Sequence, residues 1–197
     1  MSRTKKMSDS DLLEIAFDVI AREGFTSFTF EQVGKAVKLS PAALVKRFKT
    51  KKQLALLARN QKWERNIGEI ESQKFKELEG LNGIFDFLTV IANSVNSKRL
   101  NEHVIWLGTE AGNPRSRKKV AAYFETTRNV FQKLLKEAIE RGELSKKIDP
   151  KPFSKTLEAL VQGAIFQFAF LDERDIEFHL KVHFKTVLAP YILKEVT

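Results

Sequence analysis

The chain has 197 residues, of which 43% are hydrophobic and 30% are charged, and its formal net charge is +9 at pH 7. This composition excludes a disordered chain and fits a globular protein with one sizeable core, or with a small domain beside a larger one. The lack of cysteine excludes disulfides, a thiol nucleophile and a Cys-ligated zinc site. The sequence has neither the apolar run of a secretory signal nor one long enough to span a membrane, so we expect a cytoplasmic protein.

Apolar residues recur at a spacing near 3.6, which predicts an all-α protein of about nine helices. In the N-terminal quarter, four helix starts are marked by a hydroxyl residue. Three of them are followed three positions later by Asp or Gln, and the other is followed directly by proline. These N-caps are Ser8, Thr29, Ser40 and Thr50. Gly24 ends the first helix, and a tight turn at Lys38 ends the second.

The second and third of these helices, joined by about three residues and braced by the first, match a helix-turn-helix arrangement. The small Gly34 allows the two helices to approach closely. The apolar residues expected to fill the wedge between them are Val33, Val37, Leu44 and Phe48. An ordinary helical hairpin is the alternative, and the charge distribution argues against it.

Positive charge is concentrated in the N-terminal third. Residues 1–67 hold 14 Lys and Arg against 7 Asp and Glu, whereas the remaining residues have a net charge of only +2. No acidic residue lies between Glu31 and Glu64, a window that contains nine Lys and Arg. This end of the chain is therefore a candidate for binding a polyanion.

Longer helices with balanced charge follow. Their expected ranges are 81–95, 100–110, 115–141, 153–171 and 176–193. Residues 112–114 form a break, residues 142–152 read as a loop, and Pro190 is expected to kink or fray the last helix.

The N-terminal region resembles the TetR family of bacterial transcriptional regulators. The matching segments are "LLEIAFDVIAREGFTSFTFEQVGKAVKLS" and "PAALVKRFKTKKQL". The resemblance implies a DNA-binding domain over residues 1–53, including a basic N-terminal arm, and an effector-binding and dimerisation domain over residues 54–197. It also implies that a bound ligand releases the DNA.

Four residues depart from the family pattern. Lys38 stands at a turn position that is usually glycine, so a left-handed conformation there would be strained. Val45 and Arg47 replace tyrosines, and Lys49 replaces a common proline. None is a core position, so the expected fold is unaffected, but the DNA contacts need an argument of their own.

Phosphate contacts favour hydroxyls, helix N-termini and basic side chains. By resemblance, Thr29 and Lys51 match phosphate-contacting positions, and Ser40 and Thr50 begin helices nearby. Arg47 binds phosphate more strongly than the tyrosine it replaces. The basic arm at residues 2–6 either reaches a minor groove or is disordered.

Base contacts require the outward face of the third helix. The residues expected on that face are Pro41, Ala42, Ala43, Val45 and Lys46. Ala43 and Val45 can touch thymine methyl groups, and Lys46 can reach guanine O6 and N7. We therefore expect Lys46 to read sequence directly and Arg47 mainly to supply affinity.

The C-terminal half holds many of the sixteen phenylalanines, and the resemblance implies a pocket for a small hydrophobic or amphipathic ligand. Its expected lining is Phe85, Trp106, Glu110, Tyr123, Phe124, Gln162 and Phe166. Each aromatic residue taken alone is more often a core residue than a ligand contact. The polar group that orients the ligand is left open among Asn93, His103, Glu110 and Gln162.

The last two expected helices carry apolar residues on more than one face, which fits a four-helix interface between two subunits. Its expected members are Phe168, His179, His183 and Val187. The spacing of His179 and His183 also suits metal ligands, but no third ligand stands at a convincing spacing, so no metal or other cofactor is expected.

Three functions remain open at this point. The first is a dimeric repressor of a palindromic operator released by a ligand, and activation stays open as its variant because no residue reports the sign of regulation. The second is a sequence-tolerant DNA-binding or architectural protein without an effector. The third is a small helical enzyme, which has little support because the chain lacks a Gly-rich phosphate loop, an HExxH motif and a recognisable Ser-His-Asp set.

Overall fold

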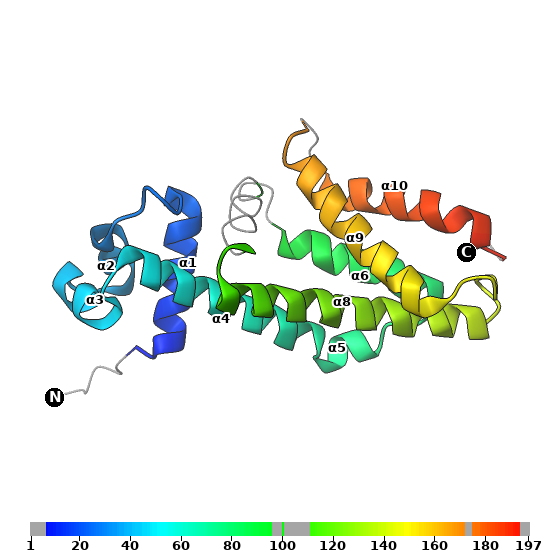
Figure 1. Ribbon diagram of the computed structural model, residues 1–197, viewed down its shortest axis with the longest axis horizontal. Coiled ribbons are helices and arrows are strands. Elements are labelled where there is room, and N and C mark those ends of the chain that lie inside the picture. Colours follow the sequence, from blue (N-terminus) through cyan, green and yellow to red (C-terminus); the bar gives the residue numbers. More distant parts are fainter. Residues whose placement is uncertain (1–6, 96–99, 101–110, 172–174, 194–197) are drawn as a thin grey trace.

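The computed structural model describes residues 7–95, 100, 111–171 and 175–193. The N-terminal helices are α1 (Asp9–Glu23), α2 (Phe30–Val37), α3 (Pro41–Phe48) and α4 (Lys51–Ile70). The later helices are α5 (Gln73–Lys76), α6 (Gly80–Ser94), α8 (Pro114–Glu140), α9 (Pro150–Phe168), α10 (Ile176–Leu188) and the short 3-10 helix η2 (Ala189–Tyr191). Figure 1 shows α1 to α3 gathered at one end, with α4 running from them to the larger helical body.

The all-α prediction is confirmed. Over the described ranges, the backbone pairs in β fashion only at an isolated bridge between Leu144 and Ile192. No helix in those ranges has both the length and the hydropathy needed to cross a membrane.

The predicted N-caps form as expected. Each hydroxyl accepts a hydrogen bond from the backbone N–H three residues on, at 3.1 Å for Ser8, Ser40 and Thr50 and at 3.2 Å for Thr29. Thr29 and Gln32 form a complete capping box, because the Thr29 N–H also donates to Gln32 Oε1 at 2.7 Å. Local sequence therefore sets the start of each of the first four helices.

Several later boundaries differ from the prediction. Helix α9 begins at Pro150, earlier than expected, because Asp149 caps it by accepting from the Lys151 N–H at 3.1 Å and proline suits a first helical position. The short α5 was not predicted. Helix α10 ends at Leu188, and Pro190 lies in η2. Proline has no N–H to continue the hydrogen bonds of an α-helix, which favours an end to α10 before it. The expected helix at 100–110 lies outside the described residues except for Leu100.

Two buried apolar clusters share α4. The N-terminal cluster includes Ala55 and Ala58, whereas the C-terminal cluster includes Trp63 and Ile70. A boundary between residues 53 and 54 would cut α4 near its start and remove part of the first cluster. We therefore propose that the two domains divide within α4, between Ala58 and Trp63.

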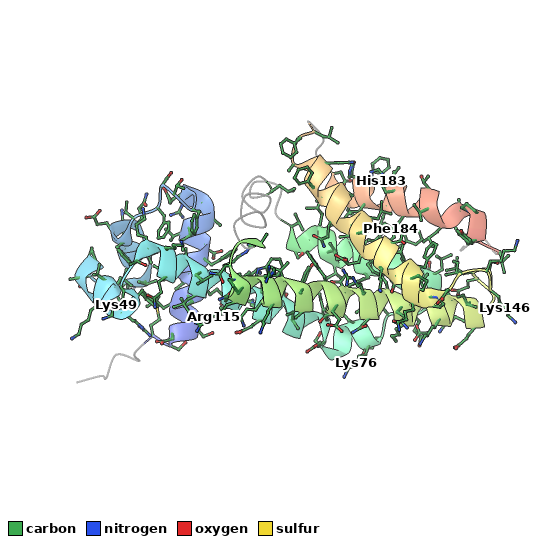
Figure 2. The ribbon with its side chains drawn as sticks, viewed as in Figure 1. Lys49, Lys76, Arg115, Lys146, His183 and Phe184 are labelled. Atoms are coloured by element: carbon green, nitrogen blue, oxygen red, sulfur yellow. The ribbon has the colours of Figure 1, made fainter. Side chains whose placement is uncertain are left out.

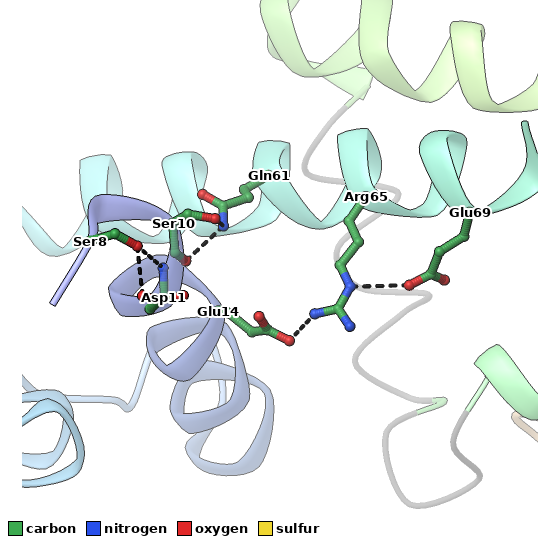
Figure 3. A network of polar contacts seen from close by, with 7 residues as sticks. All are labelled: Ser8, Ser10, Asp11, Glu14, Gln61, Arg65 and Glu69. Carbon is green, nitrogen blue, oxygen red and sulfur yellow. Dashed lines mark hydrogen bonds and ion pairs between the residues drawn. The ribbon is translucent and has the colours of Figure 1, made fainter. Parts of the chain in front are cut away.

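Polar contacts fasten α1 along α4 (Figure 3). The Gln61 side chain donates to the Ser10 carbonyl at 2.7 Å and to the Ser10 hydroxyl at 2.9 Å. Arg65 forms ion pairs with Glu14 on α1 and with Glu69 on its own helix. These contacts hold the first turns of α1 against the middle of α4.

The turns on both sides of α3 use positive φ at lysines. Lys38 adopts the expected left-handed conformation (φ 56°, ψ 41°), and the Leu39 N–H donates to the Gly34 carbonyl at 2.9 Å. Lys49 has φ 63° and ψ −57°, and Thr50 donates to the Phe48 carbonyl at 2.7 Å, which makes a γ-turn. Proline cannot adopt this φ, so the turn here differs from one built on the family's common proline.

Gly34 is required by close packing in the first of these turns. A Cβ atom at this position would lie 2.5 Å from the Leu39 carbonyl oxygen, whereas one at Gly68 of α4 would meet nothing within 4 Å. We expect Gly34→Ala to lower the free energy of unfolding by about 1–3 kcal/mol and Gly68→Ala to raise it by about 0.5–1 kcal/mol. Urea denaturation followed by circular dichroism measures both, and equal effects would contradict the proposed close contact.

Candidate functional site

Helix α3 presents nearly all of its side chains to solvent. Only Leu44 and Phe48 are buried, and both belong to the N-terminal cluster. The residues predicted to read bases are all exposed, namely Pro41, Ala42, Ala43, Val45 and Lys46. Val45 is 44% exposed, so its side chain is accessible to a binding partner.

Three helix starts flank this face. Thr29 is half-buried before α2, whereas Ser40 before α3 and Thr50 before α4 are exposed. Each hydroxyl caps one backbone N–H, which leaves other first-turn donors of these helices for an anion.

The Lys51 side chain links the start of α4 to the segment before α2. Its ammonium group donates to the Thr26 carbonyl at 3.3 Å and lies 4.9 Å from the centre of the Phe28 ring. The structure thus brings Lys51 beside the loop that leads to Thr29, although the two residues are far apart in sequence.

Arg47 has an acidic partner that the sequence did not reveal. Its guanidinium group forms an ion pair with Asp9, the first residue of α1, and lies 5.6 Å from the Phe48 ring centre. A shallow groove between the start of α1 and α3 contains both residues; it is lined by Met7, Ser8, Asp9, Leu39, Ala43 and Arg47. Only a tertiary contact brings Asp9 here, so no local pattern predicts it.

The candidate surface lies at one end of the molecule. Figure 2 shows Lys49 at the end formed by α3 and Lys146 at the opposite end, beyond the last turn of α8. This end of the molecule holds the first part of the acid-free window, because α2, α3 and the start of α4 lie there (Figure 1).

The expected pocket residues fall in different environments. Tyr123 is buried, with its ring centre 4.9 Å from that of Trp63, and Phe85 and Phe124 are half-buried against the same cluster. Phe166 was expected to line the pocket, but it is 52% exposed on the outer face of α9, beside Phe170. Of the other expected residues, Trp106, Glu110 and the alternative orienter His103 lie outside the described residues.

A polar cluster between α8 and α9 includes Gln162 of the expected pocket and three residues that the sequence analysis missed. Arg128 donates to Glu158 Oε2 from Nε at 3.1 Å and from Nη2 at 2.9 Å. Burial raises the pKa of Glu158, against the opposing effects of Arg128 and Gln162. Thr127 is also fully buried. A sequence signal did exist, because 123/127 and 158/162 are polar pairs at i, i+4 spacing within largely apolar helix faces.

Tyr123 stands at the edge of this cluster. Burial raises the pKa of its hydroxyl to about 12, with Thr127 lowering it and the charge of Glu158 raising it further. The hydroxyl is therefore neutral at physiological pH.

Two of the expected dimer residues are buried inside this chain. Phe168 and His179 are 4% and 8% exposed, and their ring centres lie 5.5 Å apart, so the prediction that they face a partner is wrong. His183 and Val187 are half-buried. Two residues along a helix turn the side chain by roughly 200°, which is why Phe168 points inward while Phe166 points outward.

Large apolar residues are exposed on α9, on α10 and in the turn that follows α9. They include Phe166, Phe170, Phe178 and Val182, with exposed fractions of 42–72%. Within the part of the chain that the structure describes, no group of three or more His, Asp or Glu side chains is placed to hold a metal ion.

Comparison with known proteins identifies both parts of the chain. Residues 12–58 match the family described as "Bacterial regulatory proteins, tetR family", and residues 109–182 match "Tetracyclin repressor-like, C-terminal domain". The two matches together cover more than half of the chain. No curated protein sequence matches it.

Solved structures share the fold at low sequence identity. A TetR transcription regulator from Haloarcula marismortui is 18% identical, with coverage of 94% of this chain and 100% of the other and a TM-score of 0.71. A transcriptional regulator from Saccharomonospora viridis in complex with choline is 15% identical (93% and 96% covered, TM-score 0.71). The regulator FadR from Bacillus subtilis in complex with stearoyl-CoA is 16% identical (90% and 96% covered, TM-score 0.59).

The helix-turn-helix geometry of α2 and α3, the two family matches and the shared fold agree. The chain therefore belongs to the TetR family, and it is a transcriptional regulator rather than an enzyme.

Proposed function

We propose that this regulator is a dimeric, cytoplasmic repressor that binds a palindromic operator through α3 and is released by a small hydrophobic or amphipathic ligand. The observation that carries the proposal is α3 itself, which is anchored by only Leu44 and Phe48 and exposes its remaining side chains. A helix held in this way can enter a major groove without disturbing its own core.

Phosphate contacts come from the groups that surround α3. Lys51, Thr50 and Ser40 lie at helix starts, and Thr29 caps α2 nearby. The ammonium group of Lys51 is held in place by its contacts with Thr26 and Phe28, so less side-chain entropy is lost when it meets a phosphate.

Base readout rests on few side chains. Ala43 and Val45 offer apolar contacts for thymine methyl groups, and Lys46 offers a donor for guanine. This sparse surface also favours the second candidate function, a sequence-tolerant DNA-binding protein. Selection of bound DNA from a random pool separates the two, because a repressor enriches one palindrome, whereas a sequence-tolerant protein enriches none.

Dimerisation is supported by the apolar face of α9 and α10. Phe166 and Phe170 lie beside each other, Phe178 and Val182 lie one turn apart on α10, and all four are exposed among the described residues. Two such helix pairs can form a four-helix interface. A twofold dimer also doubles the number of bases read, which a helix with so few reading groups needs. We therefore assign the interface to these residues in place of Phe168 and His179.

Ligand binding is supported by family membership and by the relatives. One related structure contains stearoyl-CoA and another contains choline. Tyr123, Phe124, Phe85 and Gln162 remain the proposed contacts within the C-terminal domain, and Phe166 is removed from that set.

Replacement of the two adjacent basic residues tests base readout. Lys46→Ala should weaken binding by about 1–3 kcal/mol for operators with the contacted guanine and have little effect on operators that lack it. Arg47→Ala should weaken binding to all operator variants alike. It should also reduce the slope of log affinity against log salt concentration by the amount expected for about one phosphate contact. Fluorescence anisotropy with operator variants measures both, and Lys146→Ala at the far end is the control. A uniform loss for Lys46→Ala would refute its assigned role.

The Asp9–Arg47 ion pair should oppose DNA binding, because Asp9 repels phosphate and competes for the guanidinium group. The Asp9 side chain is 75% exposed, so the pair is worth at most about 1 kcal/mol. We expect Asp9→Asn to tighten operator binding by up to about fivefold at low salt, with a smaller gain at high salt. Asp11→Asn is the control, because it removes the same charge from the same turn but leaves the partner of Arg47 in place.

The proposed interface predicts a monomeric variant. Phe178→Glu should weaken self-association by about 2 kcal/mol or more, because a buried, unpaired carboxylate replaces an apolar contact. The fold should persist, since Phe178 is 67% exposed in the single chain. Analytical ultracentrifugation measures the change, and Ala122→Glu on the exposed side of α8 is the control. If the Phe178→Glu variant dimerises with unchanged affinity, the interface lies elsewhere.

A further inference from the structure

Five polar side chains meet inside the largely apolar contact between α8 and α9, and neither DNA binding nor dimerisation uses them. Tyr123, Thr127 and Arg128 come from α8, and Glu158 and Gln162 come from α9. Thr127 and Glu158 are 0% and 3% exposed. We call this group the buried polar cluster.

Arg128 satisfies only half of the Glu158 carboxylate. Both of its hydrogen bonds go to Oε2. Among the described residues, Glu158 Oε1, Thr127 Oγ1 and Gln162 Nε2 are buried and have no hydrogen-bond partner. The Gln162 amide lies close enough to Glu158 to lower its pKa as a hydrogen-bond donor does, but the two groups do not meet the full geometry of a hydrogen bond, so Gln162 Nε2 and Glu158 Oε1 stay unpaired.

Such a group is unfavourable for folding unless something completes it. A buried polar atom without a partner loses its hydration and gains nothing in return. A buried ion pair is also a poor source of stability compared with apolar residues of similar size. Native proteins leave few buried polar atoms unsatisfied, so the three free atoms indicate a position for a polar group from outside the chain.

The free atoms define the chemistry of that group. Glu158 Oε1 needs a hydrogen-bond donor, and Gln162 Nε2 needs an acceptor. A hydroxyl or an amide supplies both, whereas a carboxylate lacks the donor, an ammonium group lacks the acceptor and a quaternary ammonium group lacks both. Arg128 already balances the charge of Glu158, so a charged group would gain little and would lose its hydration.

Aromatic rings stand beside the cluster. The Tyr123 ring centre lies 6.1 Å from that of Phe124 and 4.9 Å from that of Trp63 on α4. An occupant with an apolar body would contact these rings, and through Trp63 it would contact the helix that begins at Lys51.

We propose that the buried polar cluster binds the neutral head of the effector, a hydroxyl or amide carried on an apolar body. This inference rests on the proposed function, because it assigns the chemistry of the effector. The proposed effector is uncharged, whereas the choline and the stearoyl-CoA in the related structures both carry charge.

Four eight-carbon probes with different heads test the proposal on the full-length protein: 1-octanol, octanamide, octanoate and octyltrimethylammonium. The alcohol and the amide should raise the melting temperature and release a selected operator at the same concentrations, and the two charged probes should do neither. Binding of all four alike, binding of a charged probe in preference, or no response to either neutral probe would overturn the inference.

Two substitutions link any response to the cluster. Gln162→Leu and Thr127→Val remove the free polar atoms at nearly constant size, and each should weaken binding of 1-octanol by about tenfold, as expected for one buried hydrogen bond. Thr126→Val is the matched control, because its hydroxyl already donates to the Ala122 carbonyl at 3.0 Å on the exposed side of α8. Unchanged affinity in both cluster variants would overturn the assignment.

Operator binding without any probe separates this inference from the proposed function. A protein that selects no operator refutes the proposed repressor. A protein that binds its operator but ignores both neutral probes refutes only the assignment of the buried polar cluster.

Discussion

The architecture depends on one helix that belongs to two cores. Helix α4 begins at the candidate DNA surface, buries Ala55 and Ala58 among the N-terminal helices, and then buries Trp63 and Ile70 in the C-terminal domain. Arg59 lies at the crossing, 5% exposed, with its guanidinium group 5.7 Å from the Phe17 ring centre and 4.7 Å from that of Trp63. Because the helix is continuous, a shift of its C-terminal half necessarily changes the position of its N-terminal half. The start of α8 reinforces this connection, since Ser116 donates to the Asn60 side chain at 3.3 Å and Lys119 pairs with Glu64.

The candidate DNA surface has many groups placed to contact phosphates but few side chains that can distinguish bases. The groups around α3 are well placed for phosphates, yet the helix itself offers mostly small or apolar side chains to the bases. Affinity from phosphate contacts carries no sequence information, so in the proposed complex selectivity comes from Lys46, from methyl contacts and from the spacing of two subunits. In the proposed dimer, the α9–α10 face would contribute to DNA recognition by setting the distance between the two copies of α3. Asp9 adds a further constraint, because an acid within a basic surface reduces binding that is independent of sequence.

Local patterns in the sequence predicted most of the fold, and contacts between distant residues account for what they missed. Caps such as Thr29 with Gln32, and the apolar spacing of α1, set helix starts that the structure reproduces, because the relevant interactions span three or four residues. The inward and outward faces of α9 were harder to assign, because Phe166, Phe168 and Phe170 give the helix apolar residues on opposite sides. The Asp9–Arg47 pair and the Arg128–Glu158 pair join residues 38 and 30 positions apart, and no periodicity reports such contacts. The assigned site residues in the C-terminal domain accordingly changed more than those on α3.

Lys38 and Lys49 place α3 between two strained turns, each made by a side chain that disfavours positive φ. Both turns put an ammonium group next to the recognition helix at a position where glycine or proline would give none. Lysine at these two positions therefore lowers conformational stability but adds positive charge at the candidate DNA surface. Local opening of α3 relieves both turns at once, whereas α1 and α4 contain no residue in such a conformation. Under the proposed function, contacts between α3 and a major groove would offset the strain of these two turns.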